Sequence, residues 1–104
     1  MANVVIEFDV KQNDRDLKAC RFTIRDIPDE HVLGLAHGDE IGFDLIESKE
    51  FFYVNVSRKV YLVGHQQPIF VICIPYCFNS REELDTMLDK FKQQFADTLA
   101  IDVD

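Results

Sequence analysis

Two histidines lie beside acidic residues in the least regular stretch of the sequence, and they are the first residues that could do chemistry. Glu30 precedes His31, and Asp39 follows His37 by two positions. An imidazole with a neighbouring carboxylate can act as an acid or base, or bind a metal ion. The spacing matches no metal motif, however, and loop histidines of this kind are more often surface residues. We therefore predict no metal site and no catalytic residue, and keep His31 and His37 as candidate pocket or ligand residues.

The three cysteines are the next residues that could do chemistry. Cys73 and Cys77 would share one face of a strand if that strand continued through Pro75. A metal knuckle needs closer spacing and further ligands, and nothing beside these thiols is expected to lower a pKa. We therefore interpret both, together with Cys20, as free cysteines that pack as small hydrophobic residues, and we predict no cofactor.

Arg58 is the charged residue whose place is hardest to explain. From Phe52 to Leu62, apolar side chains fall mostly at every second position, the period of a strand with one buried face. By this alternation Arg58 points inward, between Val56 and Val60. It could line a pocket or an interface, pair with an acid, or mark a β-bulge that changes the register. We include it both among the candidate pocket residues and in the candidate interaction surface.

The whole chain has the size and composition of one small globular domain. It has 104 residues, of which 47% are hydrophobic and 29% charged, so we assign residues 1–104 to a single domain. The net charge of −8 repels nucleic acid and anionic membranes, and we expect neither as a partner. An odd number of cysteines, with no secretory leader and no apolar run of membrane length, predicts a cytoplasmic location.

Strands are the elements that must position these residues, because apolar and polar side chains alternate through much of the chain. The longest such stretch predicts a central hairpin whose two strands are joined by the loop Gly64–Pro68. Before this hairpin, a short helical turn is predicted in the irregular segment 28–39. The predicted strands are 4–11, 17–27, 41–45, 52–62 and 69–76.

A helix follows the strands. Ser80 and Glu83 form a capping box, in which the Ser80 hydroxyl accepts a hydrogen bond from the Glu83 amide. Beyond this box, apolar residues recur at helical spacing, so that one side of the helix packs on the sheet. These residues are Leu84, Met87, Leu88, Phe91, Phe95 and Leu99. The tail, residues 100–104, is predicted to fray or to lie at a sheet edge.

These elements predict an α+β fold, with a curved antiparallel sheet of about five strands, or a partly open barrel, and one C-terminal helix packed on it. One helix covers one face of such a sheet, and apolar residues remain on the other face. The sheet could close into a barrel, pair with a second copy, or bind another protein. We rank barrel closure and homodimerisation equally, and ahead of a different protein partner.

The outward residues of the central hairpin, together with Arg58, form the candidate interaction surface. This surface comprises Phe51, Tyr53, Arg58, Tyr61 and Val63. We predict a small cytoplasmic binding module that forms a homodimer through its sheet. One alternative is a small-molecule-binding or catalytic domain with a pocket between helix and sheet, near Arg58, His37 and Tyr61. A second is an acidic inhibitor that mimics nucleic acid; enzymatic activity is left open.

Overall fold

The computed structural model describes residues 1–103 and contains a sheet, one α-helix and two short 3-10 helices. The predicted strands and helix are all present, with some changes at their ends. In chain order the elements are β1 (Ala2–Gln12), β2 (Arg15–Ile27), η1 (Asp29–His31), β3 (Glu40–Leu45), η2 (Ile46–Ser48), β4 (Glu50–Tyr61), β5 (Ile69–Cys73), β6 (Tyr76–Phe78), α1 (Arg81–Gln94) and β7 (Leu99–Val103). None of the helical segments in residues 1–103 has the length and apolar character needed to traverse a lipid bilayer.

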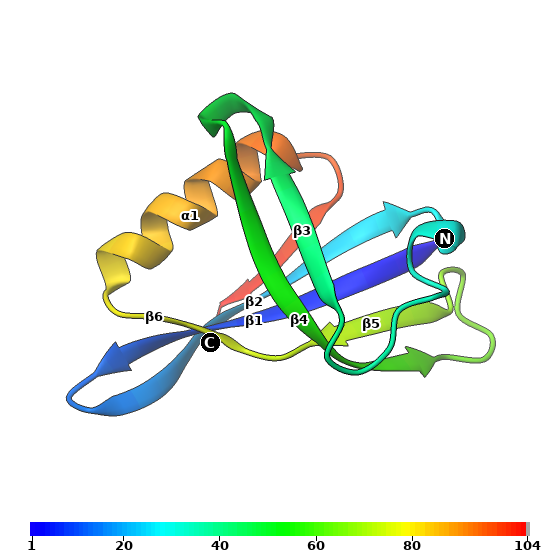
Figure 1. Ribbon diagram of the computed structural model, residues 1–104, viewed down its shortest axis with the longest axis horizontal. Helices are drawn as coiled ribbons and strands as arrows, with labels where there is room; N and C mark the ends of the chain where they lie inside the picture. The colour runs from blue at the N-terminus through cyan, green and yellow to red at the C-terminus, as the bar shows by residue number, and fades with distance from the viewer. Residues whose placement is uncertain (104) are drawn as a thin grey trace.

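The strands form one curved, open sheet in the order β3-β4-β5-β1-β2-β7, with β6 continuing beside β1. Figure 1 shows the β3–β4 ribbon crossing in front of the other strands, with α1 above them. The α+β class and the single C-terminal helix packed on the sheet are confirmed. Barrel closure, one of our two leading explanations for the uncovered face, is wrong, because β3 and β7 stand at opposite ends of the sheet across residues 1–103.

The pairing is mixed, whereas we had expected antiparallel strands throughout. Four neighbouring pairs are antiparallel, but β1 lies parallel to both β5 and β6. The physical reason lies in β1, whose residues Val4, Val5 and Ile6 are all buried. A strand that is apolar on both faces belongs in the middle of a sheet, with a neighbour on each edge. Alternation predicts which face a residue occupies, but it does not identify the neighbouring strand.

The predicted strand 69–76 is interrupted at Ile74 and Pro75. Proline has no amide hydrogen to donate to a ladder, and the Ile74 amide instead donates to the carbonyl oxygen of Asn55, 2.8 Å away. Pairing with β1 resumes in β6 after this break. Cys73 is therefore buried while Cys77 is exposed, and the expected shared face of these two cysteines is wrong.

A β-bulge in β4 changes the direction of Arg58. Val56 pairs with Cys73, but the next pair along the ladder is Arg58 with Ile72, so an extra residue is accommodated in β4. The bulge moves the residues after it to the opposite face. Arg58 is consequently exposed rather than inward, and Lys59 lies opposite the buried Val71. The predicted inward placement of Arg58 and of the residues beyond it is wrong for this reason, and the β-bulge, one of the three explanations considered for Arg58, is present.

Helix α1 begins as predicted and ends earlier. The Ser80 hydroxyl accepts a hydrogen bond of 3.2 Å from the Glu83 amide, and the side chains of Leu84, Leu88 and Phe91 are buried. The helix ends at Gln94, so the inclusion of Leu99 in its stripe is wrong; Leu99 begins β7. Residues 100–103 lie along the edge of β2, which confirms the second of the two expectations for the tail, and Asp104 lies outside the described residues.

Aromatic rings fill the space between α1 and the sheet. The Phe91 ring lies 5.5 Å from the rings of both Phe43 and Phe52, and 5.7 Å from that of Phe22, measured between ring centroids. Phe8 contacts the same group, at 5.0 Å from Phe22. The place where we expected a pocket between helix and sheet is therefore occupied by the core of the protein.

Candidate interaction surface

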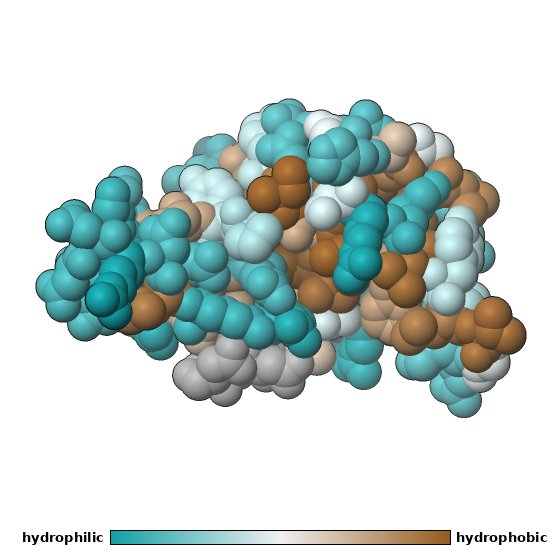
Figure 2. Space-filling view, turned by 90° about the horizontal axis from the view of Figure 1, so that it is seen from below, coloured by the Kyte–Doolittle hydropathy of each residue, from teal (hydrophilic) through white to brown (hydrophobic). Residues whose placement is uncertain are grey.

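The face of the sheet turned away from α1 carries a hollow of about 380 Å³. We call it the outer hollow. Four strands contribute to it, because the parallel pairing of β1 with β5 brings their outward side chains together. It is lined by Val5, Glu7, Arg21, Thr23, Arg58, Phe70 and Ile72. Figure 2 shows this side of the molecule, with apolar surface in the middle interrupted by hydrophilic side chains.

The two walls of the outer hollow differ in their charge partners. On the β1–β2 side, an oxygen of Glu7 lies 3.0 Å from Nη2 of Arg21 and 3.8 Å from Nζ of Lys18. On the β4 side, Arg58 lies next to Ile72 and makes no ion pair with any residue in the range 1–103. The outer hollow therefore has an apolar floor, one wall that carries ion pairs, and on the other wall Arg58, which has no ion-pair partner in the range 1–103.

Three consecutive apolar residues project from the end of the β4–β5 hairpin. Tyr61 is 57% exposed, Leu62 43% and Val63 fully exposed. We call them the apolar projection. Figure 2 shows a hydrophobic protrusion at the end of the molecule where this hairpin lies in Figure 1. Such a run of exposed apolar side chains is unusual at the surface of a protein that acts alone.

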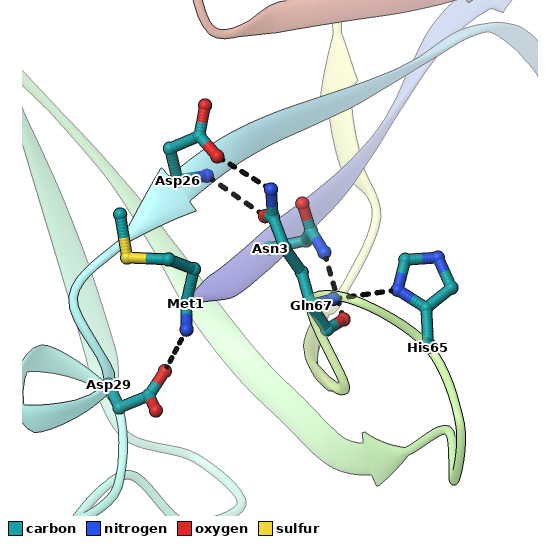
Figure 3. Close-up of polar contacts among 6 residues, drawn as sticks. All are labelled: Met1, Asn3, Asp26, Asp29, His65 and Gln67. Atoms are coloured by element: carbon teal, nitrogen blue, oxygen red, sulfur yellow. Dashed lines mark hydrogen bonds and ion pairs between the residues drawn. The ribbon is translucent and has the colours of Figure 1, made fainter.

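Polar contacts fix the hairpin loop to the end of β2, as Figure 3 shows. The side-chain amide of Gln67 accepts a hydrogen bond of 3.2 Å from the Asp26 amide and donates one of 2.6 Å to the Asp26 carboxylate. The backbone amide of Gln67 donates to Nδ1 of His65, 3.0 Å away. The side chain of the buried Asn3 donates to the backbone carbonyl of Gln67. These contacts hold the apolar projection in a fixed position relative to the outer hollow.

The structure divides the predicted interaction surface among three places. Phe51 and Tyr53 lie at the start of β4, where their rings are stacked with centroids 6.2 Å apart. The Tyr53 ring covers Gly42 of β3, where an added Cβ atom would lie only 2.8 Å from the ring. Arg58 lies at the outer hollow, and Tyr61 and Val63 belong to the apolar projection.

The predicted pocket residues are not brought together. His37 is exposed, and its Nδ1 lies 2.9 Å from the carbonyl oxygen of Ser57, beside Arg58 in the bulge. His31 lies on η1 and lines a different cleft, together with Glu40. Within residues 1–103, no group of three or more His, Cys, Asp or Glu side chains is placed to hold a metal ion.

The exposed thiol is not set up as a nucleophile. Cys77 donates a hydrogen bond of 3.3 Å to the carboxylate of Asp16. Partial desolvation, this hydrogen bond and the negative charges of Asp16 and Asp9 raise the pKa of the Cys77 thiol. Burial raises the pKa of Cys73 to about 12. Since the thiolate is the reactive form, both shifts lower reactivity at neutral pH.

Sequence reasoning expected apolar residues on this face, but it did not identify the apolar floor of the outer hollow, which is formed by Val5, Phe70 and Ile72. A signal for these residues was present, because Val4–Ile6 and Ile69–Ile74 are continuous apolar runs, typical of strands with both faces covered. The runs alone did not reveal that the two strands are neighbours.

No protein-family model matches this chain, and neither does any curated protein or any solved structure. The surface is therefore interpreted from its own shape and chemistry.

Proposed function

We propose that this protein is a small cytoplasmic binding module that forms a homodimer through the face of its sheet turned away from α1. The observation that supports the proposal is that one chain presents both a hollow and, at the end of the hairpin formed by two of the strands that line it, an apolar projection. The outer hollow has an apolar floor, and the apolar projection has three exposed apolar side chains to fill it. A surface that contains both halves of a contact can pair with a second copy of itself.

A two-fold axis would place each apolar projection in the outer hollow of the other copy. Both contacts then form at once, which closes the assembly at two chains. A stable interface of this kind buries about 800 Å² on each partner, which is roughly an eighth of the 6535 Å² accessible surface of this chain. Arg58, at the margin of the outer hollow, would lie at the polar rim of the interface.

The alternatives considered from the sequence have weaker support. A ligand pocket between helix and sheet meets the packed aromatic rings around Phe91. A nucleic-acid mimic needs carboxylates spread over one extended face, whereas Glu7 on the outer face is already paired with Arg21 and Lys18. A different protein partner in the outer hollow is distinguished from a second copy by the experiment below.

Sedimentation equilibrium of the wild-type protein and of Val63→Asp tests the proposal. The wild type should be a dimer, and Val63→Asp should raise the dimer dissociation constant by at least about tenfold, because burial of a valine is worth roughly 1.5 to 3 kcal/mol and a buried carboxylate opposes association. Ile46→Asp is the matched control, since Ile46 is 62% exposed on η2, away from the outer hollow.

At concentrations low enough to dissociate the wild-type dimer, both variants should unfold at the temperature of the wild type, because the substituted side chains are exposed. A wild-type protein that stays monomeric at high concentration would exclude the homodimer. Binding of a different protein would then be the explanation for the exposed apolar residues of this face. A Val63→Asp protein that dimerises as tightly as Ile46→Asp would show that the apolar projection takes no part.

A further inference from the structure

The end strand β3 has one free edge. In the part of the chain that the structure describes, β3 pairs only with β4, and Figure 1 shows these two strands side by side. The ladder begins where the Val56 amide donates to the Asp39 carbonyl, 2.7 Å away. Bonded and non-bonded pairs alternate along an antiparallel ladder. The backbone groups that consequently turn away from β4 are those of Glu40, Gly42 and Asp44.

An apolar cleft of about 340 Å³ runs beside this edge. It is separate from the outer hollow, because it lies between β3, the segment that follows η1, and the ends of β1 and β2. Its apolar walls are Val4, Ile27, Val32, Leu35, Ile41 and Phe43, and His31, Glu40 and Gly42 complete its lining. Three of these, Val4, Val32 and Phe43, belong to the buried core. The bottom of the cleft is therefore formed by packed core side chains.

The opposite face of β3 is acidic. Glu40 and Asp44 alternate with Ile41 and Phe43 and are both exposed, with Gly42 between them under the ring of Tyr53; Glu40 also borders the cleft. Neither carboxylate makes an ion pair within residues 1–103. Like charges placed opposite one another across strands destabilise pairing. A second copy added to this edge in antiparallel fashion would bring the acidic residues of both strands together, so the charge argues for a partner of opposite sign.

We infer that the free edge of β3 binds an extended segment of a protein partner in which apolar and basic residues alternate. Its backbone adds a strand to β3 by bonding to the outward groups of Glu40, Gly42 and Asp44. Its apolar side chains enter the cleft beside Ile41 and Phe43. Its lysine or arginine side chains lie on the other face, next to the carboxylates and near the exposed Tyr53 ring.

The probe for this inference is a blocked, fluorescently labelled peptide of alternating lysine and valine, equal in length to β3. Fluorescence anisotropy at physiological ionic strength should show saturable binding to the wild type. A peptide of alternating glutamate and valine should bind at least about tenfold more weakly, from the sum of ion pairs lost and like charges gained. N-methylation of alternate amides in the lysine peptide should abolish binding, because it removes the donors of the added strand.

The double variant Glu40→Lys, Asp44→Lys should reverse the preference and bind the glutamate peptide more tightly. Glu47→Lys, an exposed charge change on η2, should behave as the wild type. In NMR spectra the lysine peptide should shift and protect the amides of Glu40, Gly42 and Asp44. The inference is overturned if the lysine peptide does not bind, if N-methylation or charge reversal has no effect, or if those amides are already protected by a second copy without peptide.

Discussion

At the scale of single residues, the three thiols differ because of what surrounds each sulfur. Cys20 and Cys73 lie in the core at 1% and 2% exposure, whereas Cys77 lies on the outside of β6 and donates to Asp16. A carboxylate that accepts a hydrogen bond from a thiol stabilises the protonated form and raises its pKa. The exposed cysteine is therefore accessible but held in its less reactive state.

Alkylation rates should follow this difference. Iodoacetamide should modify Cys77 first, at a rate that rises with pH as the thiolate forms, and should modify Cys20 and Cys73 only on unfolding. Asp16→Asn removes a negative charge and weakens the hydrogen bond, so it should lower the pKa of Cys77 and accelerate its alkylation several-fold at neutral pH. Asp14→Asn, in the neighbouring turn, is the control; equal acceleration in both variants would mean that net charge alone sets the rate.

At the scale of elements, α1 is held to the sheet by aromatic rings and by an ion pair of 2.7 Å between Lys90 and Glu50 of β4. Phe91 meets aromatic residues of β1, β2, β3 and β4, so a single side chain joins the helix to four strands. Edge-to-face contacts of this kind add to the burial of the rings themselves. Helix α1 and the four strands that Phe91 contacts should therefore unfold together.

Phe91→Ala should lower the free energy of unfolding by about 3 to 5 kcal/mol, through lost burial and the cavity left behind. Phe51→Ala removes the same atoms from a ring that is 62% exposed, and should cost about 0.5 kcal/mol. Urea denaturation followed by circular dichroism measures both. Similar losses in the two variants would contradict the central role of Phe91.

The elements that local chemistry defines were predictable from the sequence. Alternation placed Phe22 and Ile24 inside, and the Ser80 cap marked the start of α1. The end of α1 was not predictable, because Leu99 continues the spacing of Phe91 and Phe95, and the turn between them carries neither glycine nor proline. The break before β6, in contrast, was predictable, because Pro75 cannot donate to a ladder. The predicted strand 69–76 nevertheless ran through this proline.

The candidate site was predictable only in part, because it depends on which strands are neighbours. Tyr61 and Val63 are exposed, as predicted, but the bulge puts Tyr61 on the opposite face of β4 from Phe51 and Tyr53. Arg58 signalled a possible bulge, but the spacing alone did not decide between the registers, because Val60 and Leu62 would face inward without the bulge, whereas the bulge turns Lys59 and Tyr61 to that face. The apolar floor at Val5 and Ile72 exists only because β1 and β5 lie side by side, a long-range pairing that local alternation does not encode.

At the scale of the whole molecule, the two proposed surfaces use different parts of the sheet. The outer hollow is built from β1, β2, β4 and β5, and the peptide edge from β3. No residue lines both the outer hollow and the cleft. A homodimer formed through the first would therefore leave the second open to another protein, so that one assembly carries two binding edges.

The two surfaces should accordingly be independent when each is disrupted. Val63→Asp should weaken self-association but bind the lysine–valine peptide with wild-type affinity, and the Glu40→Lys, Asp44→Lys variant should show the reverse. Sedimentation and anisotropy on the same samples measure both properties. Loss of peptide binding in Val63→Asp would show that the β3 edge functions only within the dimer.

The central position of β1 has a consequence for how the chain is made. The partners of Ala2–Val5 in β5 are Ile69–Ile72, which leave the ribosome only after most of the protein has been synthesised. Synthesis proceeds from the N-terminus, so β1 can first pair only with β2, and its second edge stays open until β5 emerges. An open apolar edge is a template for pairing with other chains. The nascent protein is therefore most exposed to aggregation during translation, before the strand that completes its sheet exists.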